Sequence, residues 1–224
     1  METLLIVDGN ALLHRGFHAI PQTFKTKSGE LINAVYGFTL MLLNTLRDEK
    51  PTYCTVAFDM KGPTFRSESY ADYKATRVKA PDELYAQLPR IKEVVRAFDI
   101  PIFERQGFEA DDLIGTLTKK AVRGGKAVLI LTGDLDTLQL VNEFVTVVAP
   151  QNGFNKAKRY DIAGVKEKWG ITPSQVIDYK ALRGDVSDNI PGVPGVGEKT
   201  AVELLTAYGS LEGIYSHIEG IKGA

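Results

Sequence analysis

The first 150 residues alternate between short apolar, β-branched runs and longer amphipathic segments. The longer segments, such as residues 33–49 and 110–125, carry apolar side chains at helical spacing. Strands separated by segments of helix length predict βαβ units, because parallel neighbours need a crossover connection. We therefore expect an α/β fold with a mainly parallel sheet flanked by helices. The expected strands span residues 3–8, 52–59, 100–106, 127–134 and 144–150.

Beyond residue 160 the helical patterns continue and the strand-like runs stop. A turn-rich segment, GDVSDNIPGVPGVG at residues 184–197, connects two of these patterns. We expect one domain over residues 1–172 and a small all-helical unit over residues 173–224. The chain ends directly after a helical pattern, which we interpret as a truncated C-terminus. Pro89 lies inside another helical pattern and predicts a kink or a late helix start there.

The overall charge does not indicate a partner, because 27 Lys and Arg residues face 28 Asp and Glu residues. The single Cys54 excludes an internal disulfide, and the three histidines, expected to be surface or packing residues, lack the spacing of zinc ligands. The N-terminus has no basic leader, and Asp8 interrupts its only apolar run. We expect neither a signal peptide nor a membrane span, and a cytoplasmic location.

Acidic side chains gather where the expected strands end. Ligands of an open parallel sheet bind outside the carboxyl ends of its strands, so these acids should meet at one edge. The turn-rich segment adds two more acids, in a turn that can fold back over the same edge. Each acid taken singly is better explained as a helix cap or turn former, and only their joint placement is specific. The nine acids are Asp8, Asp59, Glu109, Asp111, Asp112, Asp134, Asp136, Asp185 and Asp188.

So many carboxylates cannot stay ionised together without countercharge, and the short motifs that hold them contain no Lys or Arg. Hard divalent cations with oxygen ligands, Mg²⁺ or Mn²⁺, would supply that charge. Two such ions about 4 Å apart activate a water and stabilise the leaving oxygen of a phosphodiester. The sequence therefore predicts metal-dependent phosphodiester hydrolysis.

Two further segments indicate a nucleic-acid substrate. Residues 62–81 interleave cations with Phe65, Tyr70 and Tyr73, which on one helix would present charges and rings together. A solvated amphipathic helix explains this segment equally well. Residues 190–201 combine a glycine- and proline-rich turn with the start of a helix, whose amides can bind phosphate. Loop flexibility is the alternative explanation. The cations of the first segment are Arg66, Lys74, Arg77 and Lys79.

Five sequence blocks together resemble a known family. They are VDGNALLHRGFHAI, FRSESYADYKATR, GFEADDLIGTL, LTGDLDTLQLV and GDVSDNIPGVPGVGEKTA, in this order along the chain. They are similar to the signature blocks of the 5′ nuclease domain of bacterial DNA polymerase I, within the flap endonuclease family. The resemblance implies a PIN-like core with a helical arch at about residues 62–96 and a C-terminal helix-hairpin-helix module that binds DNA.

The resemblance also implies a function and a site. Such enzymes are 5′-3′ exonucleases and flap endonucleases of DNA replication and repair, acting on DNA with a 5′ flap, a nick or an RNA primer. We expect two or more Mg²⁺ or Mn²⁺ ions at the nine acids, K⁺ at the glycine hairpin, a monomer, and a polymerase domain in the parent chain. Lys74 and Arg77 match the catalytic cations. The residues expected to contact DNA are Arg66, Tyr73, Lys79, Gly192, Gly195, Gly197, Lys199 and Thr200.

The sequence departs from the family pattern at four positions, and none removes a carboxylate. These are His14, Gly16, Leu135 and Val186. Three other functions stay open. A haloacid-dehalogenase-like phosphatase would explain the DLDT motif, a non-catalytic DNA-binding module would use the acids only as caps, and an RNA-cleaving PIN domain would share the core.

Overall fold

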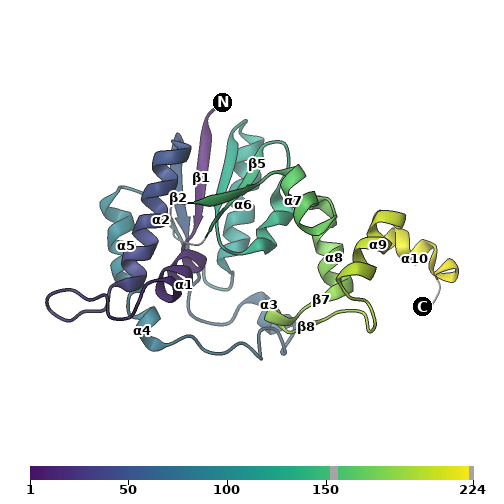
Figure 1. The fold of residues 1–224 in the computed structure, drawn as a ribbon, viewed down its shortest axis with the longest axis horizontal. Coiled ribbons are helices and arrows are strands. Elements are labelled where there is room, and N and C mark those ends of the chain that lie inside the picture. The colour runs from purple at the N-terminus through teal and green to yellow at the C-terminus, as the bar shows by residue number, and fades with distance from the viewer. Residues whose placement is uncertain (152–155, 222–224) are drawn as a thin grey trace.

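The computed structural model describes residues 1–151 and 156–221. They form a six-stranded sheet in the order β3-β2-β1-β4-β5-β6, with helices on both sides (Figure 1). All neighbours are parallel except β5 and β6, which are antiparallel. The expected α/β fold with a mainly parallel sheet is thus confirmed. The strands are β1 (Thr3–Asp8), β2 (Tyr53–Ala57), β3 (Ile102–Phe103), β4 (Ala127–Leu131), β5 (Val145–Pro150) and β6 (Ala157–Tyr160).

Four of the five expected strands are shorter than the apolar runs suggested, and three further strands were missed. β2 ends two residues before Asp59, and β3 has only two residues. The sequence of β6 is mostly polar because it forms the exposed edge of the sheet. The expectation that strands stop after residue 160 is wrong, since β7 (Gly184–Asp185) pairs with β8 (Ile190–Pro191). Two-residue strands are too short to show a periodic pattern.

Alternation along the strands divides the core between the two faces of the sheet. Leu5 and Val7 pack with α1 (Gly9–Ala19), α2 (Asn33–Glu49) and α5 (Leu88–Ala97). Ile6 and Ile130 pack on the other face, with α6 (Ala110–Arg123) and α7 (Ile162–Trp169). The strand order turns around between β1 and β4, which is where a parallel sheet opens a crevice for ligands.

Close packing of α1 on α2 explains the glycine at position 16. A Cβ on Gly37 would lie 2.6 Å from Gly16 Cα, so both helices need glycine where they cross. The buried Asn33 at the start of α2 then donates to the carbonyls of Phe17 and Ile20, at 2.8 and 3.0 Å. Gln87 donates to Asn33 Oδ1 at 2.9 Å, which ties the segment before α5 to this corner.

Residues 62–81 cross the carboxyl ends of the strands as a largely irregular segment, which we call the strap. Only α3 (Phe65–Ser69) is helical there, so the helix expected to carry Tyr70, Tyr73 and the cations is wrong. Lys74 has a left-handed backbone, with φ of 57°. After the strap come α4 (Asp82–Tyr85) and α5, with Pro89 in its first turn, so the late helix start is confirmed. The strap runs along the lower edge of Figure 1.

The C-terminal helices are α8 (Val176–Arg183), α9 (Glu198–Tyr208) and α10 (Leu211–Ser216). Buried side chains of α8 and α9, including Tyr179 and Leu205, join the core cluster that covers one face of the sheet. The β7–β8 hairpin connects α8 to α9, and Gly192 approaches the backbone of Arg183 so closely that a Cβ would collide with it. No helix within the described ranges is long and apolar enough to cross a membrane.

Candidate metal centre

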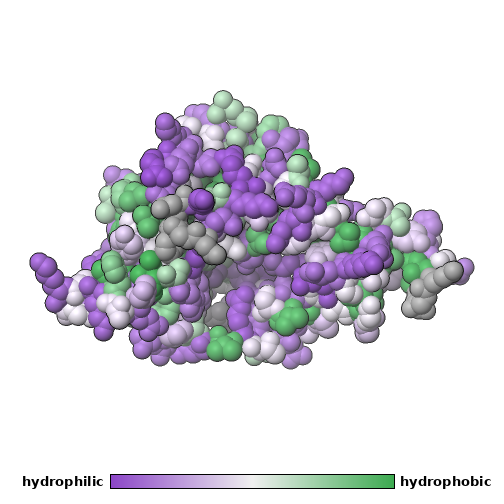
Figure 2. All heavy atoms as spheres, viewed as in Figure 1, coloured by the Kyte–Doolittle hydropathy of each residue, from purple (hydrophilic) through white to green (hydrophobic). Residues whose placement is uncertain are grey.

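Four aspartates and Glu109 line one cavity at the carboxyl ends of the strands. Asp8 ends β1, Asp59 follows β2, Asp111 lies in the first turn of α6 and Asp134 follows β4. We call these four aspartates the sheet-edge acids. The cavity measures about 630 Å³, and the strap closes it on the other side with Lys74, Arg77 and Lys79. Figure 2 shows the surface hollowed between the strap and the body of the molecule.

Asp8 is fixed at the crevice between β1 and β4. Its Oδ1 accepts from the backbone N–H of Ala11 at 2.9 Å, and its Oδ2 accepts from the Thr132 hydroxyl at 2.7 Å. Only 4% of Asp8 is exposed, and this burial raises the pKa of its carboxyl to about 6. Thr132 was missed by sequence reasoning, because a threonine after a strand carries no distinctive signal.

Asp59 reaches the same cavity from the loop after β2. The Asp59 backbone N–H donates to Asn10 Oδ1 at 3.0 Å, and Asp59 Oδ1 accepts from the N–H of Ala110 at 2.6 Å. These bonds join the β2 loop to α1 and to the N-terminus of α6. Burial raises the pKa of Asp59 as well.

Asp111 has no hydrogen bond or ion pair with any residue in the described parts of the chain. Burial, followed by the charges of Asp8, Asp134 and Asp59, raises the pKa of Asp111 to about 8. Asp134 donates its backbone N–H to the Thr132 hydroxyl and accepts from the N–H of Asp136, each at 2.9 Å. Within the described residues, none of the four sheet-edge acids forms an ion pair. This uncompensated negative charge suits a divalent cation.

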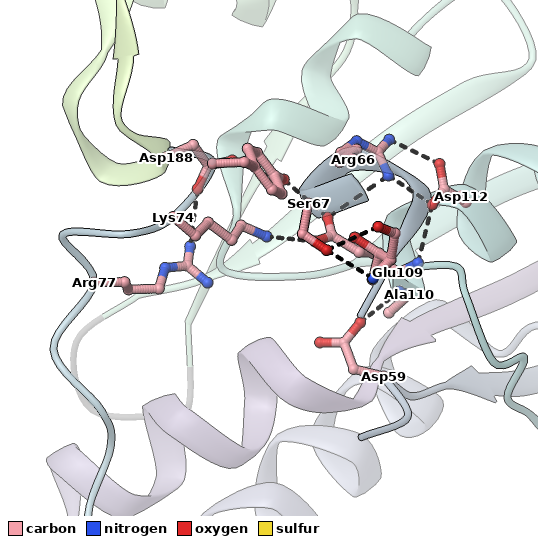
Figure 3. Close-up of polar contacts among 11 residues, drawn as sticks. Asp59, Arg66, Ser67, Lys74, Arg77, Glu109, Ala110, Asp112 and Asp188 are labelled. Carbon is pink, nitrogen blue, oxygen red and sulfur yellow. Dashed lines mark hydrogen bonds and ion pairs between the residues drawn. The ribbon is translucent and has the colours of Figure 1, made fainter. Parts of the chain in front are cut away.

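Glu109 and Asp112 lie beside the sheet-edge acids and are paired with cations of the strap (Figure 3). Arg66 donates to both oxygens of Asp112, at 2.7 and 2.8 Å, and Lys74 donates to Glu109 at 3.0 Å. Burial tends to raise the pKa of Asp112, but the bonds from Arg66 and from the Glu109 backbone lower it overall. The short motifs that hold these acids contain no Lys or Arg, and the cations that pair with Glu109 and Asp112 come from a segment distant in sequence.

Three further acids form a separate group where η1 (Leu135–Leu140) meets the β7–β8 hairpin. Asp136, Asp185 and Asp188 each offer one carboxylate oxygen, and these oxygens lie within 4.8 Å of one another. We call them the hairpin acids. The Lys180 ammonium of α8 donates to Asp136 and, at 2.6 Å, to Asp185. Burial opposes ionisation of Asp185, but Lys180 and Ser187 lower its pKa to about 2.

The strap connects the two groups of acids. The Tyr73 hydroxyl donates to Glu109 at 3.0 Å and lies 3.2 Å from Asp188. Arg77 donates to Asp188 at 3.3 Å (Figure 3). The Lys74 backbone N–H also donates to the carbonyl of Asp188, at 2.9 Å. Lys74 and Arg77 therefore lie between the cavity and the hairpin.

The residues expected to contact DNA are spread along the surface beside the acids. Arg66 is turned inward to Asp112, and Lys79 pairs with Asp82 on the exposed part of the strap. Gly192 and Gly195 shape the loop before α9, and Gly197 is the N-cap of that helix without a capping side chain. Lys199 and Thr200 follow in the first turn of α9, with 91% of the Lys199 side chain exposed. Their contacts with DNA stay predictions.

Sequence reasoning missed four side chains of this site besides Thr132. Asn10 and Lys180 hold acids in place, and neither position has a signal that distinguishes it from an ordinary polar residue. His14 and His18 line the cavity on the face of α1 that starts at Ala11. Their spacing of three and seven residues from Ala11 could have identified them, since it places them on one helix face.

Comparison with known proteins assigns the chain to a family. Residues 3–170 match the 5′-3′ exonuclease N-terminal resolvase-like domain, and residues 171–224 match the 5′-3′ exonuclease C-terminal SAM fold. The chain is 51% identical over 221 residues to DNA polymerase I of Mycobacterium leprae, covering 98% of this chain and 24% of the relative. For DNA polymerase I of Bacillus caldotenax the identity is 46% over 222 residues, covering 99% and 25%. The chain thus spans about a quarter of the length of these relatives.

Solved structures share the fold. T5 5′-exonuclease with bound divalent metal ions (zinc) has a TM-score of 0.81 at 23% identity, covering 100% of this chain and 82% of that one. The catalytic core of Rad2 in complex with a DNA substrate has a TM-score of 0.59 at 17% identity, covering 98% and 66%. At these identities the likeness shows the fold, a resolvase-like α/β core with a C-terminal helical module. The two domain matches together span nearly the whole chain, and this protein belongs to the 5′-3′ exonuclease family.

Proposed function

We propose that this chain is a structure-specific 5′ nuclease that hydrolyses phosphodiesters of 5′-flapped or nicked DNA with Mg²⁺ or Mn²⁺. The observation that carries the proposal is the cavity in which four sheet-edge acids without ion pairs face cations of the strap. Carboxylates hold hard divalent ions, and cations opposite them hold a phosphate, so both halves of a phosphodiester site are present.

The residues present fit the metal. Carboxylate oxygens are the donors that Mg²⁺ and Mn²⁺ prefer, and the buried Asp8 and the partly buried Asp111 have raised pKa values that an adjacent divalent cation would reverse. The sheet-edge acids and the hairpin acids would hold the ions, with Glu109 and Asp112 beside them. When bound, two ions activate the attacking water and stabilise the leaving oxygen.

The strap and the C-terminal module would hold the substrate. Lys74 and Arg77 extend toward the cavity, where they would orient the scissile phosphate and balance the charge that builds on it. Tyr73 would stack on a terminal base pair, while Arg66 and Lys79 would contact DNA. The uncapped amides of α9, together with Lys199 and Thr200, would bind backbone phosphates, with K⁺ at the glycine hairpin.

Two alternatives fit the geometry less well. A haloacid-dehalogenase-like phosphatase needs a free nucleophilic Asp at the end of the first strand. Both carboxylate oxygens of Asp8 are instead engaged by hydrogen bonds. A non-catalytic module that uses its acids only as caps gives no role to Asp111, which caps nothing and has no hydrogen bond or ion pair among the described residues.

The deciding experiment compares flapped, nicked, blunt and single-stranded DNA and a generic aryl phosphate, each with Mg²⁺ and with chelator. We expect cutting of the flap near its junction, only with the metal, and no turnover of the aryl phosphate. Asp134→Asn should abolish cutting and leave duplex binding intact. Asp99→Asn is the matched control, since Asp99 is exposed and has a φ of 54° that Asn accepts readily. Turnover of the aryl phosphate alone would favour the phosphatase.

We further propose that the parent protein is a bacterial, cytoplasmic DNA polymerase I, and that this chain supplies its primer-removing nuclease. The support is the identity of about half with DNA polymerase I over 98% of this chain. We propose that residues 1–172 form the nuclease core and that residues 173–224 form the DNA-binding module. We also propose that the protein is a monomer. Limited proteolysis tests the boundary, because a cut near residue 172 is expected between the two domains. Analytical sedimentation tests whether the protein is a monomer in solution.

A further inference from the structure

The Lys180 side chain lies among the hairpin acids, where a second divalent ion would bind. Its ammonium donates to Asp136 and to Asp185, two of the three residues whose oxygens lie within 4.8 Å of one another. Lys180 is 21% exposed, and Asp185 is 14% exposed. The contact is therefore a partly buried, charge-assisted pair, unlike a surface ion pair that water and salt weaken.

Packing of α8 and the short connection from α8 to the hairpin fix the position of Lys180 relative to the hairpin acids. On α8, Val176, Tyr179 and Leu182 are buried in the core, which fixes the helix against the sheet. The hairpin begins one residue after α8, so Asp185 is held at short range, and the Ser187 hydroxyl donates to its other oxygen at 2.6 Å. The ammonium and the acids are thus positioned by the same rigid elements.

We propose that Lys180 is a positioning residue that holds the hairpin acids together and competes with a divalent ion for their oxygens. The inference rests on the proposed metal-dependent function and adds a residue that controls how tightly the hairpin acids bind a divalent ion. An ion that binds the two oxygens that Lys180 contacts, Asp136 Oδ1 and Asp185 Oδ2, must displace the ammonium, because two cations cannot occupy the same position between them. The hairpin acids are therefore a weaker cation site than the sheet-edge acids, where no described Lys or Arg forms an ion pair.

The charge balance shows the direction of the effect. Two of the three hairpin acids, Asp136 and Asp185, pair with Lys180, and the third, Asp188, pairs with Arg77. Removing the Lys180 charge leaves one more carboxylate uncompensated within contact distance of the ion. Lys180→Met keeps the length of the side chain without its charge. We expect it to tighten divalent binding at the hairpin acids by roughly tenfold or more, as the loss of a nearby like charge predicts.

The test is calorimetric titration of Mn²⁺ into the metal-free protein, without DNA. The wild type should show one tighter and one weaker step, and Lys180→Met should strengthen only the weaker step. Lys180→Arg keeps the charge and should bind like the wild type. Lys166→Met is the matched control, because it removes the same charge from an exposed position on α7 and should change neither step. Adding Asp185→Asn to Lys180→Met should abolish the gain.

The inference is overturned if a folded Lys180→Met protein binds Mn²⁺ in the weaker step with unchanged or lower affinity. It is also overturned if Lys166→Met raises that affinity as much as Lys180→Met does. A second measurement covers the case in which Lys180→Met does not fold. In wild-type protein with ¹³Cε-labelled lysine, titrated with diamagnetic Mg²⁺ in place of Mn²⁺, the Lys180 signal, assigned by its loss in Lys180→Arg, should shift only during the second step. A signal that stays unchanged through both steps also overturns it. Protein that binds Mn²⁺ but cuts no DNA would refute the proposed nuclease function and leave the role of Lys180 standing.

Discussion

The sheet-edge acids and the hairpin acids are built from the same side chain, yet Asp111 of the first group and Asp185 of the second have pKa values shifted in opposite directions. Asp136 lies between these extremes, because burial and the charge of Asp134 raise its pKa although Lys180 opposes the shift. Burial raises the pKa of Asp111 to about 8, because neighbouring carboxylates add to it and no described residue pairs with it. The pKa of Asp185 falls to about 2, although burial opposes this, because Lys180 and Ser187 donate to its carboxylate. The first group needs an external cation, and the second group already has an internal one.

The difference follows from where the two groups sit in the fold. The sheet-edge acids lie at the ends of parallel strands, where cations of the strap line the same cavity but form no ion pair with them among the described residues. The hairpin acids lie against α8, from which the partly buried Lys180 reaches two of them. Carboxylates that share a site without a base are a stronger cation site than carboxylates that share one with a lysine. The two groups should therefore respond differently to substitution, pH and loss of metal.

The largest effect should come from removing one acid of each group. We expect Asp111→Asn to lower the rate of flap cleavage by at least roughly a thousandfold, as loss of a charge-stabilising group in an active site does. Asp185→Asn should lower it by roughly ten- to a hundredfold, because Lys180 already offsets part of its charge. Single-turnover cleavage and duplex binding should be measured for both, with binding unchanged. If the two variants lose cleavage rate by the same factor, the sheet-edge acids and the hairpin acids do not differ in their contribution to cleavage.

Lys74→Ala should come next, since Lys74 contacts Glu109 through its side chain and Asp188 through its backbone. We expect kcat to fall by roughly ten- to a hundredfold with little change in KM, because the lysine would act on the charge of the transition state. Lys79→Ala removes the same charge from an exposed part of the strap and should raise KM more than it lowers kcat. If Lys74→Ala leaves turnover unchanged, its assignment as a catalytic cation is wrong.

Stability without metal should fall as the pH rises. The folded-state pKa values of Asp8 and Asp111 are raised to about 6 and about 8, so the folded state binds their protons more tightly than the unfolded state. That stabilisation is complete below the unfolded pKa and is lost as the pH rises through the folded values. In chelator we expect the unfolding midpoint to drop by roughly 5 °C between about pH 5.5 and about pH 8.5.

Two controls locate this pH effect at the sheet-edge acids. Asp111→Asn should reduce the pH dependence in chelator, since it removes the larger of the two shifts. Asp185→Asn should not, because the pKa of Asp185 is lowered and its stabilisation is complete at all of these pH values. A midpoint that rises with pH in chelator would contradict the picture of uncompensated carboxylates.

The smallest effect should come from the strap contact with the hairpin acids. The Arg77 side chain is 55% exposed where it pairs with Asp188, so water and salt screen the pair. Arg77→Gln should change the free energy of unfolding by less than about 1 kcal/mol in a denaturant titration. A larger loss of unfolding free energy would show that the Arg77–Asp188 pair holds the strap to the hairpin more strongly than an exposed ion pair does.

Sequence patterns predicted much of this molecule for identifiable reasons. The β1 run was predicted to the residue, because a buried parallel strand is continuously apolar and ends at a polar side chain. The acids at the strand ends followed from the rule that parallel strands share one edge. β6 and the β7–β8 hairpin were missed, since a polar edge strand and two-residue strands have no period to detect. The strap was mistaken for a helix, because its charges and rings repeat at helical spacing.

The sequence by itself determined the α/β class, the family resemblance and the gathering of acids at the strand ends, because periodicity and short motifs are local properties of the chain. The tertiary structure alone decided which acids are neutralised. Arg66 meets Asp112 across 46 positions, and Lys180 meets Asp136 across 44. Such pairs depend on how distant elements pack, and the electrostatic state of a carboxylate is set by its neighbours in space.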